Sequence, residues 1–338
     1  MDQAKTDTQT ETLAQISHVL IHSTLPPAAM SAEVLRFGRI LADDPAFDSG
    51  APGLSDLASG TDNGWAISPY RAKMCLADYR RTLEFMRGVF KAVSDLRSRI
   101  GDRPVRLLYA GCGPLAPLVM PSLALFEAEA LQVTLLDMHE ESLRTAQYLI
   151  EAHALGDRIA EYVEADAGKY LIDEDAVPDI VLMEILESCL DQEPQVGVSR
   201  HLIGQCPDAL LIPERISVHL TLANVEKEFG FGDAFLERDR IEVGEIFSLD
   251  KVHIQDWGDD TGGQLPAATL TLPEYDRFRY SPLLRTVLQT YGGHGLHEYD
   301  SGLTCPRSHA SLENAKPGHR LAFHYRTGAQ PTLVSVLV

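Results

Sequence analysis

Residues 105–116 read Val105-Arg-Leu-Leu-Tyr-Ala-Gly111-Cys-Gly113-Pro-Leu-Ala116, an apolar run followed directly by a Gly-x-Gly turn. An apolar strand that ends in such a turn ahead of a helix predicts a cradle of nucleotide size. A second strand of the buried type ends in the carboxylate of Asp137. The spacing from Gly111 to Asp137 fits a βαβ unit, in which an acid at this place hydrogen-bonds ribose hydroxyls.

The alternation of strands and helices continues to residue 212. Strands are expected over 105–110, 132–137, 160–164, 179–183 and 209–212, and helices around 115–127, 140–154 and 194–205. This order predicts a parallel α/β sheet of Rossmann-like type. Beyond Pro213 the pattern changes to β-type alternation, in the stretches 215–222, 267–272, 321–325 and 332–338. We therefore expect a C-terminal antiparallel β domain.

The N-terminal region predicts a helical lid. Two short amphipathic helices fall within residues 11–42, with a break at Pro26-Pro27, and residues 43–64 have the Asp, Gly, Pro and Ser content of a linker or mobile loop. Ser68-Pro69 then starts a long helix that runs to about Leu96. The expected units are a lid and linker (1–64), a Rossmann-like domain with its leading helix (65–213) and a β domain (214–338).

Composition narrows the class of partner. The chain has 338 residues and a net charge of −20, which argues against nucleic acid and anionic membrane as partners and leaves small molecules. No apolar run approaches the roughly 20 residues of a membrane helix, and the polar start lacks the apolar core of a signal peptide. These features predict a soluble, cytoplasmic protein.

Cysteine and histidine patterns predict no metal site. The five cysteines lack paired metal spacing, which favours free thiols over a disulfide framework or a zinc site. Histidines gather late in the chain, as in His294-Gly-Leu-His297, but no cysteine or acid completes a ligand set at a clear spacing.

Acidic side chains follow the third and fourth strands. Asp166 ends the third strand at the same carboxyl edge as Gly111, where it either hydrogen-bonds an adenine amino group or caps a turn. Glu184 follows the apolar strand 179–183, and a loop then carries Glu187 and Glu193. Paired carboxylates bind and orient a cation such as guanidinium by two-pronged hydrogen bonds. The alternative for Glu187 and Glu193 is that they are ordinary solvated acids.

These residues resemble the class I S-adenosylmethionine-dependent methyltransferases, and among them the protein arginine methyltransferases. That branch ends its fourth strand with a glutamate and places a second one nine positions later, in a hairpin called the double-E loop, and Glu184 and Glu193 have this spacing. Gly111-x-Gly113-Pro-Leu resembles the glycine motif of the type II branch. Leu211-Ile-Pro213 resembles the strand and proline by which the family leaves its sheet for a β-barrel. The resemblance runs from about Trp65 to the C-terminus and is strongest over 105–222.

The resemblance implies S-adenosylmethionine as cofactor and a role for each matching residue. Gly111 and Gly113 would approach the methionine part of the cofactor, Asp137 the ribose, Asp166 with Ala167 the adenine, and Arg81 the cofactor carboxylate. Met138, next to Asp137, would also contact the cofactor. Tyr109 stands in the cofactor pocket where the family usually carries an acid, and Leu115 replaces a third glycine. Glu184, Glu193 and Glu187 would form the catalytic set.

Partners of the resembling family set further expectations. The family forms homodimers through an arm inserted in its barrel, which makes a homodimer an expectation here, although residues 230–262 show no readable arm. Neither the family's aromatic pair in the N-terminal helix nor its Thr-His-Trp motif is evident, with Asp256-Trp257 a poor substitute. The acceptor predicted on these grounds is a small nucleophile of small-molecule biosynthesis: a guanidine, an amine or a carboxylate.

Two other functions stay open on the sequence. An S-adenosylmethionine cyclase such as an azetidine-2-carboxylate synthase, which releases methylthioadenosine, also resembles class I methyltransferases with an added N-terminal cover. Tyr109 suits that reaction, since cyclisation needs a free cofactor amine rather than a clamped ammonium. The third function is a non-catalytic scaffold with a vestigial cofactor pocket.

Overall fold

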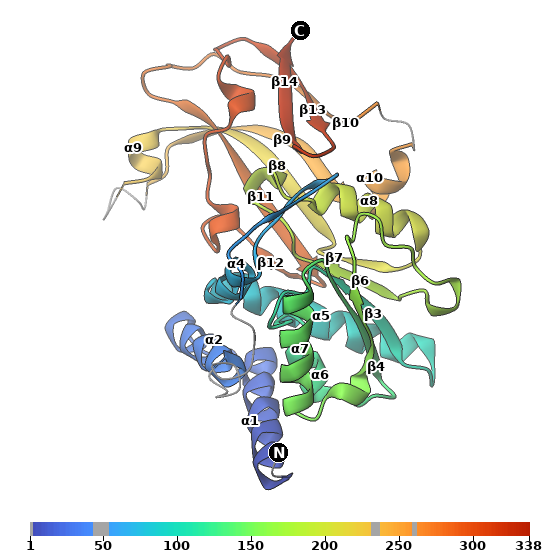
Figure 1. Ribbon diagram of the computed structural model, residues 1–338. Coiled ribbons are helices and arrows are strands. Elements are labelled where there is room, and N and C mark those ends of the chain that lie inside the picture. Colours follow the sequence, from blue (N-terminus) through green and yellow to red (C-terminus); the bar gives the residue numbers. More distant parts are fainter. Residues whose placement is uncertain (1–2, 43–53, 231–236, 259–261) are drawn as a thin grey trace.

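The computed structural model describes residues 3–42, 54–230, 237–258 and 262–338. Five parallel strands form its central sheet in the order β5-β4-β3-β6-β7 (Figure 1). Their bounds are β3 (Val105–Ala110), β4 (Leu131–Asp137), β5 (Ile159–Glu164), β6 (Ile180–Met183) and β7 (Leu210–Ile212). The order reverses between β3 and β6, and in sheets of this kind ligands bind at the carboxyl ends of the strands where that reversal occurs.

The helices connected to this sheet are α5 (Tyr79–Ile100), α6 (Met120–Leu125), α7 (Glu140–Ala152) and α8 (Gln195–Gln205). Three short 3₁₀ turns lie between elements of the sheet: η2 (Gly156–Arg158), η3 (Glu174–Ala176) and η4 (Ser188–Leu190). The helix predicted around 115–127 begins only at Met120, because Pro114 and Pro117 cannot donate the backbone hydrogen bonds of a helix interior. The other predicted strands and helices of the sheet lie within a residue or two of their expected bounds.

The N-terminal helices are α1 (Gln3–His22) and α2 (Pro27–Ala42), which confirms two helices with a break before Pro27. Their apolar faces are fully buried at Leu20, Val34 and Phe37, and α1 packs against α5 and α6. Arg87 of α5 donates to the carbonyls of Leu20 and Ser23 at the end of α1 (2.9 and 2.7 Å). Both helices thus contribute to the core, and their role as a lid stays a prediction.

The segment before α5 differs from the single helix predicted between Ser68 and Leu96. It consists of α4 (Pro69–Met74), the 3₁₀ turn η1 (Cys75–Ala77) and then α5. Asp78 has a non-helical backbone (φ −76°, ψ 81°) and its carboxylate accepts the backbone N–H of Arg81, so that it caps α5. The cap restarts the helix one turn before Arg81 and directs this arginine inward.

The linker predicted over 43–64 also needs correction in its second half. Residues 43–53 lie outside the described residues, but β1 (Ser59–Thr61) and β2 (Gly64–Ala66) form an antiparallel hairpin. In Figure 1 this hairpin is the blue ribbon that runs from α4 toward α8. The turn Asp62-Asn63 favours a hairpin, since these residue types tolerate the backbone of tight turns.

The C-terminal part forms two antiparallel sheets, β12-β11-β8-β9 and β10-β13-β14. The bounds are β8 (Arg215–Ala223), β9 (Arg240–Asp250), β10 (Gln264–Thr271), β11 (Ser281–Tyr291), β12 (His294–Leu296), β13 (Arg320–Arg326) and β14 (Thr332–Leu337), with α9 (Val225–Glu228), α10 (Lys251–Asp256), η6 (Gly302–Thr304) and η7 (Ala310–Leu312) between them. The sequence did not predict β9, β11 or β12. Because β9 and α10 occupy 240–256, the described part of 230–262 belongs to this sheet region.

The predicted fold class is therefore confirmed: a Rossmann-like parallel sheet, N-terminal helices and C-terminal antiparallel sheets. None of the described helices is both long and apolar enough to cross a membrane.

Candidate active site

The backbone of the Gly-x-Gly turn after β3 lies close to the neighbouring segments. Gly111 and Gly113 both adopt left-handed backbone (φ 70° and 62°), which favours glycine. A Cβ at Gly111 would lie 2.3 Å from Cγ2 of Ile185, so that a larger residue there would displace the chain that follows β6. The backbone N–H groups of Gly111 and Cys112 both donate to the carbonyl of Leu136 (2.8 and 3.2 Å), which ties the turn to β4.

Asp137, at the end of β4, faces the same turn. Its Oδ2 accepts the backbone N–H of Gly113 and its Oδ1 that of His139, each at 2.9 Å. The residue is buried, and the imidazole Nδ1 of His139 lies 3.3 Å from Oδ1. A carboxylate offers about four lone-pair sites, so these contacts leave acceptor capacity for a pair of hydroxyls.

Asp166 acts as a turn cap and also faces the cavity. Its Oδ1 accepts the backbone N–H of Gly168 at 2.9 Å, which confirms the capping alternative. Asp166 and its neighbour Ala167 nevertheless line the same cavity as the glycine turn. The two roles are compatible because the second oxygen of Asp166 is not used by the cap.

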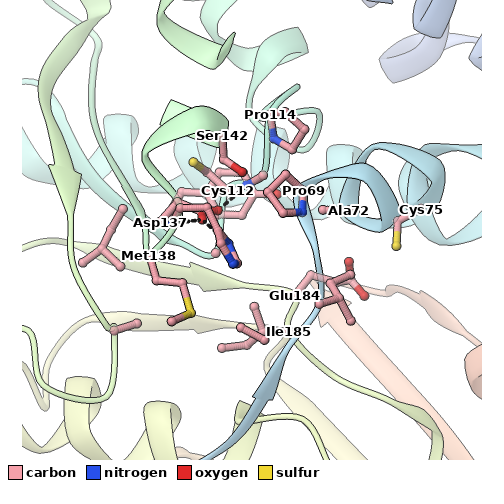
Figure 2. Close-up of a pocket in the computed structure, with 18 of the residues that line it drawn as sticks. Pro69, Ala72, Cys75, Cys112, Pro114, Asp137, Met138, Ser142, Glu184 and Ile185 are labelled. Atoms are coloured by element: carbon pink, nitrogen blue, oxygen red, sulfur yellow. Dashed lines mark hydrogen bonds and ion pairs between the residues drawn. The ribbon is translucent and has the colours of Figure 1, made fainter. Parts of the chain in front are cut away.

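These residues surround one cavity at the carboxyl ends of β3, β4 and β6. Asp137 and Met138 lie on one side of it and Glu184 on the other, with Pro69, Ala72 and Cys75 contributed by α4 and η1 (Figure 2). The structure thus brings together every residue that the sequence suggested for the cofactor: Arg81, Tyr109, Gly111, Gly113, Asp137, Met138, Asp166, Ala167 and Glu184.

Glu184 and Arg81 form a buried ion pair beside the cavity. Nη1 of Arg81 donates to Oε1 of Glu184 at 3.2 Å, and Nη2 donates to the carbonyl of Cys75 at 2.8 Å. Burial raises the pKa of Glu184, while the guanidinium of Arg81 acts in the opposite direction. Burial opposes the charge of Arg81, but the carboxylate of Glu184 keeps the pKa of Arg81 above its ordinary value.

Glu193 lines the cavity from the start of α8 and has no such partner. In the described part of the chain, no basic side chain lies within 4 Å of its carboxylate. Burial, together with the neighbouring carboxylates of Glu184 and Glu187, raises the pKa of Glu193 to about 8. The site therefore contains an acid whose charge lacks a cation.

Glu187 lies elsewhere, which corrects the prediction that three acids meet in one pocket. Oε1 of Glu187 accepts from Nη1 of Arg307 at 3.0 Å, and neither residue is among those that line the cavity. The ion pair with Arg307, in the loop before η7, turns this carboxylate toward the C-terminal sheets. Glu187 thus affects the site only through its charge near Glu193.

The β1–β2 hairpin closes the cavity, a role that sequence reasoning missed. Thr61 and Ala66 line the cavity, and Asp62 forms an ion pair with Lys169 (2.8 Å), three residues after Asp166. The amide of Asn63 fills the gap between β5 and α8, because a Cβ at Gly168 or Gly197 would lie 2.2 or 2.3 Å from it. The Asp-Asn-Gly turn was the available signal for a hairpin, but nothing in it indicates what the hairpin covers.

The cysteines are free thiols in the structure. Cys112 lines the cavity, where burial raises the pKa of its thiol. Within the described residues there is no group of three or more histidine, cysteine or acidic side chains arranged to hold a metal ion.

Comparison with known proteins adds little to this description. No protein-family model and no curated protein matches the chain. Among solved structures, the crystal structure of PRMT6 is similar with a TM-score of 0.49 and 11% sequence identity, over 75% of this chain and 96% of that chain. A likeness of this degree says nothing of what the protein does, so that the function is inferred from the site.

Proposed function

We propose that the protein is an S-adenosylmethionine-dependent methyltransferase whose acceptor is a small guanidine. The observation that carries the proposal is the partly buried carboxylate of Glu193, which forms no ion pair with any described basic side chain, beside the ion pair of Glu184 and Arg81. The cavity joins this acidic end to a nucleoside-type end at Asp137 and Asp166.

The residues present fit the cofactor. Asp137 retains acceptor capacity for ribose hydroxyls, the left-handed Gly111 and Gly113 leave room beside the turn, and Asp166 and Ala167 line the cavity where they would contact adenine. Arg81 supplies a cation at the opposite end, where a carboxylate of the ligand would compete with Glu184. When bound, the cofactor supplies a methyl group on a positively charged sulfur, which needs little further activation.

The charge balance of the acidic end supports a monocation as acceptor. Before the cofactor binds, Arg81 neutralises one of the two carboxylates, so that Glu184 and Glu193 together with Arg81 carry one unmatched negative charge when Glu193 is ionised. A carboxylate acceptor would add a second buried negative charge, which is costly. A guanidinium matches the charge and offers several N–H donors in one plane, so that two carboxylates fix its orientation.

Glu193 also supplies a destination for the proton. A guanidinium nitrogen that gains a methyl group must lose a proton if the product is to remain a monocation. The carboxylate of Glu193, in the ionised form that binds the guanidinium, would accept that proton and then return it to solvent. Glu184, paired with Arg81, would orient the guanidinium, and the β1–β2 hairpin would exclude water from the reacting groups.

Cyclisation of the cofactor is the second candidate, and one observation favours it. Tyr109 lies in the cavity at the end of β3, fully buried, and burial raises the pKa of its hydroxyl well above 10. It is therefore neutral and provides no carboxylate to hold the cofactor amine as an ammonium, which an intramolecular attack by that amine requires.

Product analysis separates these functions. The purified protein is incubated with S-adenosylmethionine alone, and then with L-arginine, agmatine, guanidinoacetate or L-lysine, and products are identified by mass. We expect S-adenosylhomocysteine and a methylated guanidine. Methylthioadenosine formed without an acceptor, above the spontaneous background, would instead establish cyclisation. If calorimetry detects no binding of the cofactor, the remaining function is a non-catalytic scaffold.

A further inference from the structure

The loop that carries the two acids has an unusual backbone. We define the acid loop as residues 184–193, between β6 and α8. Three of its residues adopt left-handed backbone although none is glycine: Cys189 (φ 64°), Leu190 (φ 58°) and Gln192 (φ 59°). Side chains with a Cβ rarely adopt this conformation, and it persists only where the surroundings enforce it.

The enforcing contacts come from the C-terminal sheets. The backbone N–H of Cys189 donates to Oγ1 of Thr286 on β11 at 2.7 Å. The hydroxyl of Tyr325 on β13 donates to the carbonyl of Leu190, also at 2.7 Å. Thr286 and Tyr325 are both completely buried, so that no water can replace either bond.

The rest of the acid loop is held by backbone contacts. The N–H of Gln192 donates to the carbonyl of Pro331, just before β14, and the carbonyl of Gln192 accepts the N–H of Trp65 in the β1–β2 hairpin, each at 2.9 Å. Glu193 follows directly. Residues 189–192 thus lie between the two glutamates in the chain and are held by both the β1–β2 hairpin and the residue before β14.

We propose that the C-terminal sheets hold the acid loop in its left-handed conformation, with Thr286 and Tyr325 as positioning residues that set the distance between the carboxylates of Glu184 and Glu193. The inference rests on the proposed function, because it assigns these contacts to acceptor binding and methyl transfer. Neither side chain touches the cavity, so that each acts through the loop backbone.

Removing either hydroxyl leaves a buried backbone group without its partner, which the loop relieves by leaving the left-handed conformation. Thr286→Val and Tyr325→Phe keep the size of the side chain. Thr286→Ser restores the acceptor oxygen. Thr221→Val on β8 and Tyr291→Phe on β11 are matched controls, since they remove hydroxyls from buried side chains whose hydrogen bonds lie away from the loop.

We expect Thr286→Val and Tyr325→Phe each to lower kcat/KM for the acceptor at least tenfold, with cofactor affinity by calorimetry within twofold of the unchanged protein. Thr286→Ser recovers most of the activity. Thr221→Val and Tyr291→Phe retain the activity even if their melting temperatures fall as much as those of Thr286→Val and Tyr325→Phe. Full turnover in Thr286→Val and Tyr325→Phe, or an equal loss of turnover in the controls, would overturn the proposal.

Gln192 provides a test that leaves the core intact, because its side chain is exposed and only its backbone serves the loop. Glycine and asparagine accept a φ near 60°, whereas a β-branched residue does not. Gln192→Gly and Gln192→Asn should therefore retain acceptor turnover, and Gln192→Val should lose at least tenfold. Equal turnover in all three variants would contradict the proposal even if Thr286→Val or Tyr325→Phe fails to fold.

The proposed function and this inference fail in different ways. If the unaltered protein forms no methylated product with any guanidine, the proposed function fails, whatever the variants do. If the unaltered protein methylates a guanidine but the Gln192 variants do not separate by backbone preference, only the positioning role of the C-terminal sheets is refuted.

Discussion

The carboxylates at the two ends of the cavity, near β4 and near β6, have different hydrogen-bond and ion-pair partners. At the β4 end, the carboxylate of Asp137 is held by two backbone N–H groups at 2.9 Å, and Asp166 by a third. At the β6 end, Arg81 forms an ion pair with Glu184, and the pKa of Glu193 is raised to about 8 although the charge of Arg81 acts to lower it. The first end is complete without a ligand, whereas the second lacks a cation. The comparison teaches that backbone hydrogen bonds already hold the carboxylates at the β4 end, whereas at the β6 end only Glu184 is paired with a basic side chain among the described residues.

Glu184→Gln should have the largest effect, because it damages the acid end twice. It removes a carboxylate that orients the acceptor, and it leaves the buried guanidinium of Arg81 without its partner. Breaking a buried pair in this way costs about 3 to 5 kcal/mol. We expect a lower free energy of unfolding in urea and a loss of methyl transfer. A variant as stable as the unaltered protein would show that the pair is not buried as described.

Glu193→Gln should affect catalysis without affecting stability. The amide resembles the protonated acid that predominates below pH 8, so the free energy of unfolding at pH 7 should stay within about 0.5 kcal/mol. Loss of a buried charge partner should cost about 2 to 5 kcal/mol of binding free energy. The value of kcat/KM for the guanidine should therefore fall roughly 30- to 5,000-fold. Glu161→Gln, an exposed acid on β5, is the control and should retain full activity. Unimpaired turnover in Glu193→Gln would remove this residue from the site.

Asp137→Ala tests the other end of the cavity. Loss of hydrogen bonds to a charged acceptor should weaken cofactor binding by about 1.5 to 3 kcal/mol, roughly 10- to 150-fold. The same change frees the N–H groups of Gly113 and His139, which adds to the effect. Calorimetry with S-adenosylhomocysteine provides the measurement. An affinity equal to that of the unaltered protein would refute the assignment of the nucleoside end.

Gly197→Ala should have the smallest effect. Its Cβ would lie 2.3 Å from Oδ1 of Asn63, so the tip of the β1–β2 hairpin must move away from α8. A looser hairpin exposes the cavity, and cofactor dissociation measured by stopped flow should accelerate a few-fold. Gly204→Ala, on the same helix with nothing within 4 Å, is the matched control. Equal rates in both variants would show that the hairpin does not retain the cofactor.

Sequence reasoning located most of this site because the relevant residues directly follow apolar strands. Asp137 and Glu184 each end a run whose periodicity is readable, and strand ends of a parallel sheet meet at one edge. The position of the Glu187 side chain could not be predicted, because its partner Arg307 is 120 positions away in the sequence and is brought next to it only by tertiary packing. The break at Asp78 was missed because the apolar spacing continues across it, and the cap depends on one side chain.

The N-terminal helices show the other limit of a sequence pattern. Their amphipathic spacing predicted a buried face correctly, but the spacing says nothing of the partner surface. They pack against α5, α6 and η1, while residues of the short β1–β2 hairpin line the cavity itself. Three residues per strand carry too little pattern for a hairpin of that length to be recognised.

The pH dependence of acceptor binding tests the role of Glu193 most directly. Because the raised pKa leaves this acid protonated below about pH 8, and because only the ionised form attracts a guanidinium, affinity should fall about tenfold for each pH unit below 8. The measurement is calorimetry with L-arginine or agmatine in the presence of S-adenosylhomocysteine, from pH 5.5 to 9, on the unaltered protein and on Glu193→Gln. We predict this decline in the unaltered protein and a flatter, weaker profile in the variant. Affinity that does not change with pH in the unaltered protein, or that changes identically in both, would contradict the proposed recognition of a cation by Glu193.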